Sequence, residues 1–159
     1  MRPSALVPLL LALPLAASAA AQNCPVQGVS TQDFGQASGL FDPAILGLAI
    51  DPDACELDVS IEAFTCCNVF ISKHFLGYGF SPLPNPQPLG PPFVSGSNLY
   101  INLAMLLGPF PGKTSSLSVP PNPGLVGLTV DFQAFPVYFT TIGFTEDFAA
   151  TQAVAATFL

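Results

Sequence analysis

Four acidic residues that lie close together are the best candidates for binding chemistry in this sequence. Asp51, Asp53, Glu56 and Asp58 place four carboxylates in one short segment. Ca²⁺ takes six to eight oxygen ligands, and short acidic loops supply them. The spacing is not that of an EF-hand loop, because Cys55 stands at the third ligand position and the glycine is missing. The segment predicts either a calcium site or a turn at Asp51 followed by strand carboxylates that face water.

Catalytic chemistry has less support. His74 is the only histidine, and it stands in an apolar segment with no recognisable nucleophile motif nearby. We therefore expect a core or surface histidine. Two carboxylates would suffice for a glycosidase, but tryptophan, the usual sugar-stacking residue, is absent. We expect no catalytic residues and no cofactor other than calcium at the acidic segment.

The four cysteines, Cys24, Cys55, Cys66 and Cys67, are an even number, as in exported disulfide-bonded domains. If the segment after Cys55 is one extended strand at about 3.3 Å per residue, Cys55 lies far from Cys66 and Cys67. This favours pairing of Cys24 with Cys55. Cys66 and Cys67 would then form a strained ring between adjacent residues, or else each would bond to a separate partner.

Alternating apolar and polar residues predict the elements that carry these side chains. Leu57, Val59 and Ile61 alternate with acidic and hydroxyl residues, which is typical of a half-buried antiparallel strand. Further strands are expected over residues 69–80, 98–107, 128–134, 117–119 and 154–158. This pattern predicts an all-β fold, an antiparallel β-sandwich of about six to eight strands with one or two short helical turns.

Prolines mark the expected breaks between these strands. Pro82, Pro84, Pro86 and Pro88 precede two more prolines, so residues 82–92 are expected to form an extended loop. Asn122 followed by Pro123 has the capping chemistry of a single helical turn, which Gly127 ends. A second short helix is expected to begin near Asp42 and Pro43.

The first residues predict export. Arg2 supplies a positive charge, residues 5–15 are mostly leucine, valine and alanine, and small residues follow up to Ala21. This is the pattern of a signal peptide, residues 1–21, which leaves residues 22–159 as a single β-sandwich domain. We expect a protein that is secreted or held at the cell surface or in the periplasm, with no membrane insertion after signal removal.

Charge narrows the range of partners. The chain has a formal net charge of −7, and loss of Arg2 with the signal leaves two lysines against ten carboxylates, a charge of −8. Nucleic acid is therefore excluded as a partner on electrostatic grounds. Self-association or an extracellular polymer is the remaining expectation for a partner.

The later half of the chain carries a sequence pattern. Residues 118–128 run Ser-Val-Pro-Pro-Asn-Pro-Gly-Leu-Val-Gly-Leu, with Gln133 in the strand that follows and Gly79-Phe80-Ser81 further upstream. This resembles a recurrent C-terminal pattern of small uncharacterised secreted β-rich proteins of planctomycete-like bacteria. The resemblance implies a compact β-sandwich, often a module of larger extracellular proteins, and supplies no catalytic residues.

The leading hypothesis is a non-catalytic, secreted or surface-associated β-sandwich module with a structural or adhesive role. A calcium-dependent glycan or polymer binder that uses Asp51 and Asp53 is the second hypothesis. A small hydrolase that depends on carboxylates is the third.

Overall fold

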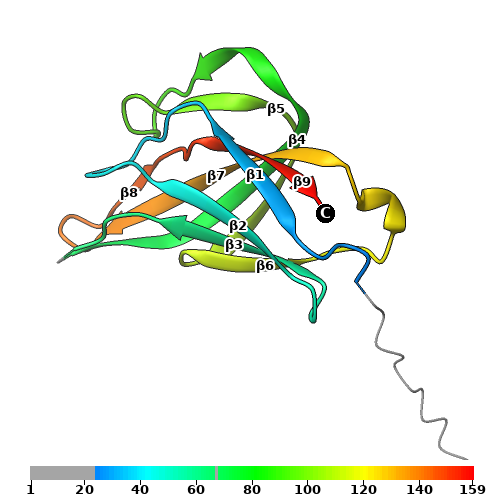
Figure 1. Cartoon of the computed structure of the whole chain (residues 1–159). Helices are drawn as coiled ribbons and strands as arrows, with labels where there is room; N and C mark the ends of the chain where they lie inside the picture. Colours follow the sequence, from blue (N-terminus) through cyan, green and yellow to red (C-terminus); the bar gives the residue numbers. More distant parts are fainter. Residues whose placement is uncertain (1–23, 67) are drawn as a thin grey trace, which may run out of the picture.

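The protein is an all-β sandwich. The computed structural model describes residues 24–66 and 68–159, which form two antiparallel sheets that pack against each other (Figure 1). The predicted signal peptide, residues 1–21, lies outside the described residues. Within the described part of the chain there are nine strands, somewhat more than the alternation predicted.

The larger sheet, sheet A, has the strand order β1-β9-β7-β4-β5, and β8 pairs with β7 beyond the end of β9. Its strands are β1 (Val29–Phe34), β4 (Val69–Pro88), β5 (Asn98–Pro111), β7 (Thr129–Thr140), β8 (Thr145–Phe148) and β9 (Ala153–Phe158).

The smaller sheet, sheet B, has the strand order β2-β3-β6. Its strands are β2 (Ile45–Asp51), β3 (Glu56–Glu62) and β6 (Thr114–Ser118). The predicted alternation in β3 is confirmed, because Leu57, Val59 and Ile61 are all buried while the residues between them face outward. These three side chains pack with apolar residues of β4, β7 and β9 in the core between the sheets.

The predicted proline-rich loop is wrong over its first part. Strand β4 continues to Pro88, and Pro82, Gln87 and Pro88 pair with β5 through an irregular register. Prolines are tolerated there because β4 has already parted from β7, whose last partner on β4 is Gly79. This part of β4 therefore needs ladder donors on one side only. The outer part of the β4–β5 hairpin lies at the top of Figure 1, and its loop is bonded to sheet A through a β-bridge between Phe93 and Phe148.

Strand β7 is buried on both faces, although its sequence alternates. Asp131 is 6% exposed and Gln133 is fully buried, on the face opposite Val130 and Phe132. Part of that outer face is covered, since Gln133 bonds to the backbone of Asn98 and Tyr100 at the start of β5. Alternation therefore predicted the strand but not its full burial.

The predicted helical turn after Asn122 is confirmed, but the second predicted helix is not. A 3₁₀ helix, η1 (Pro123–Leu125), begins where Asn122 Oδ1 accepts a hydrogen bond from Gly124 N at 2.9 Å. Gly127, at φ 83°, allows the chain to turn into β7. The second helix expected near Asp42 and Pro43 is absent, and the chain makes a bend there instead.

Candidate functional site

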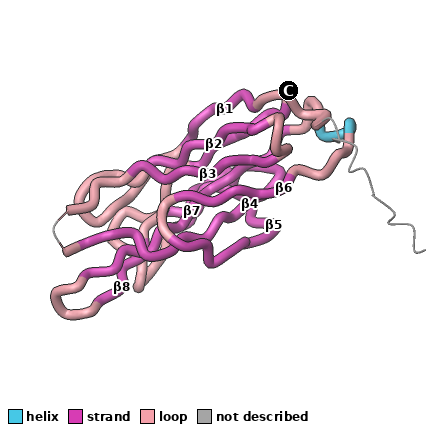
Figure 2. Tube along the Cα trace, turned by 90° about the horizontal axis from the view of Figure 1, so that it is seen from below, coloured by secondary structure: helices cyan, strands magenta, loops and turns pink. Residues whose placement is uncertain are grey.

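The candidate binding site is an apolar cavity at one end of the sandwich. Figure 2 shows η1 and the C-terminus at this end of the long axis, with β8 at the opposite end. The cavity has a volume of about 390 Å³ and lies between the sheets, where side chains of both reach it. Its walls include Leu57 and Leu117 of sheet B and Tyr78, Val130, Phe132 and Phe158 of sheet A.

The segment between β6 and β7 closes the cavity on one side. Residues 119–128, which we term the arch, contribute Val119, Pro120, Leu125 and Leu128 to the lining. Gly127 N donates to Phe158 O at 2.8 Å, and Phe158 N donates to Leu128 O at 3.1 Å, so the arch is tied to β9. The proline-rich motif singled out in the sequence is therefore a wall of the cavity.

The mouth of the cavity is apolar as well. Phe80 is 64% exposed and Leu128 is 38% exposed, and both belong to the lining. No charged side chain of the described residues lines the cavity. Its side-chain hydroxyl groups come from Tyr78 and Ser118, and Tyr78 Oη already lies 3.6 Å from Met105 Sδ. Such a site suits a neutral, hydrocarbon-rich molecule.

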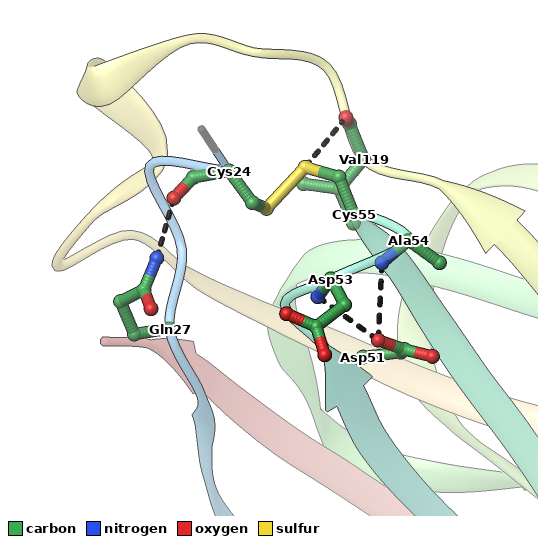
Figure 3. The surroundings of a disulfide bond; sticks show 7 residues. All are labelled: Cys24, Gln27, Asp51, Asp53, Ala54, Cys55 and Val119. Atoms are coloured by element: carbon green, nitrogen blue, oxygen red, sulfur yellow. Dashed lines mark hydrogen bonds between the residues drawn. A yellow bond between two sulfur atoms is a disulfide. The ribbon is translucent and has the colours of Figure 1, made fainter. Parts of the chain in front are cut away.

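The predicted disulfide between Cys24 and Cys55 is confirmed and lies next to the arch (Figure 3). Their Cα atoms are 5.2 Å apart. Val119 N donates to Cys55 O at 2.9 Å, and Val119 O lies 3.5 Å from Cys55 Sγ. We interpret the second distance as packing, because a disulfide sulfur carries no proton to donate. The disulfide therefore fastens the N-terminal segment and the β2–β3 turn beside one wall of the cavity.

The other two cysteines are described only in part. Cys66 is partly buried, whereas Cys67 lies outside the described residues. The alternatives for this doublet stay predictions.

The four acidic residues have separate local roles. Asp51 Oδ1 accepts hydrogen bonds from Asp53 N at 3.0 Å and from Ala54 N at 3.1 Å, which closes the β2–β3 turn (Figure 3). Asp58 Oδ1 accepts from Ser116 Oγ at 2.7 Å on the neighbouring strand. Glu56 is the cross-strand partner of Asp51. Within residues 24–66 and 68–159, no three acidic, histidine or cysteine side chains gather as a metal site.

His74 is fully buried between the sheets. Its Nδ1 lies 2.8 Å from Gly112 O and its Nε2 lies 3.0 Å from Ser115 Oγ. A carbonyl can only accept, so Nδ1 carries the proton and Nε2 accepts from the serine hydroxyl. Burial lowers the pKa of His74, and the bond to Gly112 O opposes that effect only in part.

The hydrogen-bond direction between Ser115 and His74 is that of a nucleophile and its general base. The imidazole, however, is 0% exposed and stacks on Phe110, with ring centroids 5.3 Å apart. In this arrangement the pair links β6 to β4 across the core.

Two buried glutamines, Gln133 and Gln152, have a structural role that the sequence did not predict. Gln133 accepts from Tyr100 N at 3.0 Å and donates to Asn98 O and Thr151 O at 2.7 and 2.9 Å. Gln152 exchanges two hydrogen bonds with the backbone of Leu46. A buried amide is stable only when its donors and acceptors are satisfied. The signal that could have indicated this role is a glutamine within an apolar strand, as Gln133 is in β7.

A second apolar cavity, of about 320 Å³, involves the β4–β5 hairpin. Leu89, Phe93 and Leu103 contribute to it, together with Phe135 of β7 and Phe148 of β8. The ring of Phe93 contacts both Phe135 and Phe148, at centroid distances of 6.1 and 5.5 Å. These aromatic contacts hold the hairpin against sheet A.

Among the described residues there is no helix with the length and apolar character needed to cross a membrane. Comparisons with models of protein families, with curated proteins and with solved structures find no match.

Proposed function

We propose that this chain is a non-catalytic, secreted or surface-associated β-sandwich module with a structural or adhesive role, which acts by pairing with a second copy of itself. The observation that carries the proposal is the free edge of β5. Export is supported by the signal-peptide pattern of residues 1–21 and by the disulfide between Cys24 and Cys55.

Strand β5 ends sheet A, and among the described strands it pairs with β4 alone. Gln133 bonds to Asn98 O and Tyr100 N, so the free part of this edge begins after Tyr100. A free edge presents unpaired N–H and C=O groups, which attract another strand. Natural proteins protect such edges with charged residues, yet no charged residue occurs from Asn98 to Gly112. Pro109 and Pro111 interrupt the donors only near the end of β5.

The middle of β5 is also apolar and exposed. All five residues from Asn102 to Leu106 are exposed, with Leu103 at 40%, Met105 at 51% and Leu106 at 49%. Short, uncharged and apolar segments without proline form strong contacts between strands. A strand added here would cover these side chains as well as pair with the backbone.

The occupant we propose is the β5 strand of a second copy. Two antiparallel copies of one edge are related by a two-fold axis, so each contact is made twice. The acidic residues do not oppose this contact locally, because the pairing segment carries no charge. The remaining negative surface would keep the paired protein soluble.

The test measures the mass of the mature protein, residues 22–159, by light scattering during size-exclusion chromatography over a range of concentrations. We expect a dimer for the natural sequence and a monomer for Met105→Lys. Gln36→Lys adds the same charge at an exposed loop position and should leave the dimer intact. Equal melting temperatures would show that both variants fold. A natural protein that is monomeric at all concentrations, or a Met105→Lys protein that still dimerises, would overturn the proposal.

A further inference from the structure

We propose that the 390 Å³ cavity at the arch end is a binding site for the hydrocarbon chain of a neutral amphiphile. The site goes beyond the structural or adhesive role, although Leu107 of β5 also belongs to its lining. Three features carry this proposal: the position of the cavity, its lining and the acidic charge of the chain.

The position makes the cavity reachable from solvent. It begins in the core between the sheets, where Leu57 is 3% exposed, and ends at Phe80, which is 64% exposed. A continuous apolar path therefore runs from the core to the surface. A single elongated chain could bury its length along this path, at about 0.8 kcal/mol per CH₂ removed from water.

The lining favours hydrocarbon over polar ligands. Leu57, Leu117, Leu125 and Val130 offer only carbon atoms, and the rings of Tyr78 and Phe132 lie side by side with centroids 6.3 Å apart. A polar group bound deep in this cavity would lose its water without gaining a partner. The volume falls within the range of small-molecule sites, toward its lower end.

The acidic charge of the chain favours a neutral head group. Ser118 lines the cavity, its cross-strand partner is Glu56, and the partner of Glu56 on the next strand is Asp51. Glu56 alternates with the buried Leu57, so these two carboxylates lie on the outer face of sheet B, and no charged side chain of the described residues lines the cavity itself.

No basic side chain of the described residues lines the cavity. Lys73 and Lys113, the basic residues of the described chain, bind Glu146 and Ala63 O respectively. An anionic head group would therefore find no counter-charge at the cavity in a chain rich in carboxylates, whereas a hydroxyl-bearing head needs none.

The arch sets the shape of the site and explains its sequence. Prolines at positions 120, 121 and 123 stiffen the segment, and Asn122 caps η1 so that Leu125 is half-buried against the core cluster. The disulfide supports the same wall through the bond from Val119 N to Cys55 O. A wall held this firmly keeps the cavity open before the ligand arrives, which lowers the entropic cost of binding.

The test uses the mature, oxidised protein and the neutral dye Nile red, followed by displacement below the micellar concentration of each competitor. The competitors are 1-monolauroylglycerol and dodecanoate at about pH 8, which share one chain length and differ in head-group charge. We expect saturable dye binding at one site, displacement by the monoglyceride, and at least tenfold weaker displacement by dodecanoate. Absence of saturable binding, or equal displacement by the two competitors, would overturn the proposal.

Three arginine variants locate the site. Leu128→Arg places a charge at the mouth and should weaken binding of the monoglyceride at least tenfold. Val126→Arg changes a 49% exposed residue of the same arch that does not line the cavity, so its affinity should match that of the natural sequence. Leu89→Arg alters the second cavity and should also leave the affinity unchanged. Loss of binding in Leu89→Arg alone, or in Val126→Arg as much as in Leu128→Arg, would place the ligand elsewhere and refute the assignment.

Discussion

The side chain of Gln152 pairs with the backbone of Leu46 in both directions. Leu46 N donates to Gln152 Oε1 at 3.0 Å, and Gln152 Nε2 donates to Leu46 O at 3.1 Å. The glutamine precedes β9 of sheet A, whereas Leu46 lies in β2 of sheet B. A primary amide here takes the place of a neighbouring peptide group, so the two sheets are joined by hydrogen bonds as well as by apolar packing.

Replacing Gln152 with leucine should therefore destabilise the fold. The change leaves a buried N–H and a buried C=O of Leu46 without these partners, at a cost of about 1–3 kcal/mol for each group. Urea unfolding at neutral pH would measure this as a lower midpoint with an unchanged slope. Gln32→Leu, at an exposed position of β1, is the matched control and should change stability by less than about 0.5 kcal/mol. Equal midpoints for the two variants would show that the Gln152 bonds contribute nothing net.

Stability should fall as the pH is lowered below about 6.5, because of His74. Burial lowers the pKa of His74 in the folded protein, so the imidazole stays neutral there while the unfolded chain takes up a proton. Stability is therefore complete above the unfolded pKa and is lost as the pH falls toward the folded pKa. Because His74 is the only histidine, its replacement by glutamine should remove this slope in urea unfolding measured between about pH 7.5 and 5.5. A slope that persists in His74→Gln would assign it to another group.

Asp131 should respond to pH in the opposite direction. Its carboxyl group is buried in β7 with the residue only 6% exposed, and desolvation raises its pKa. The folded protein therefore holds this proton to a higher pH than the unfolded chain does. The group stabilises the fold below the unfolded pKa of about 3.9, and that contribution is lost as the pH rises through the folded pKa.

Asp131→Asn should accordingly raise the urea midpoint at neutral pH, since the uncharged amide avoids the cost of burying a charge. The advantage over the natural sequence should shrink as the pH falls. Asp147→Asn changes another carboxylate of sheet A, in β8, for which the same measurement should detect little difference. A lower midpoint for Asp131→Asn at neutral pH would contradict the prediction.

Loss of the disulfide should be costly. Cys24 and Cys55 are separated by 31 positions, and a bond that closes a loop of this size contributes about 3–4 kcal/mol through the unfolded chain. The double variant Cys24→Ser with Cys55→Ser avoids an unpaired thiol and should melt at a clearly lower temperature than the oxidised protein. Since the bond also supports Val119, dye uptake by the cavity should weaken below the melting transition. Identical melting curves would argue against the bond in the native protein.

Substitutions at Asp51 distinguish the two roles considered for the acidic segment, which are closing the β2–β3 turn and binding calcium. Asp51→Ala removes the acceptor of two backbone N–H groups and should cost about 1 kcal/mol, whereas Asp51→Asn keeps an oxygen there and should cost less. Calcium binding by Asp51 and Asp53 is the separate hypothesis, which calorimetric titration addresses. If calcium affinity survives in the variant Asp51→Ala with Asp53→Ala, that hypothesis fails.

Local chemistry made some of these features predictable from neighbouring residues. The alternation of Leu57, Val59 and Ile61 predicted β3 because successive side chains of a strand point to opposite faces. Asn122 and Pro123 predicted η1 because capping involves residues two or three positions apart. The extended strand after Cys55 favoured pairing with Cys24 because it carries the chain away from Cys66 and Cys67.

Other features depend on which distant segments meet. Exposure of Leu103 and Met105 could not be predicted from their alternation, because it depends on which parts of sheet A the rest of the chain leaves uncovered. The strand at Pro82 and Pro88 was missed because only the departure of β4 from β7 frees the second side of that segment.

The sequence by itself thus determined the all-β class, the strand faces near the acidic segment, the turn at Asn122 and the favoured disulfide, since each rests on short-range geometry. Tertiary structure alone decided the arch cavity, the free β5 edge, the burial of His74 and the bonds between Gln152 and Leu46. These features arise from contacts between residues far apart in the chain, for example 106 positions in the last case. Such contacts depend on strand order and sheet packing, which alternation along one segment does not encode.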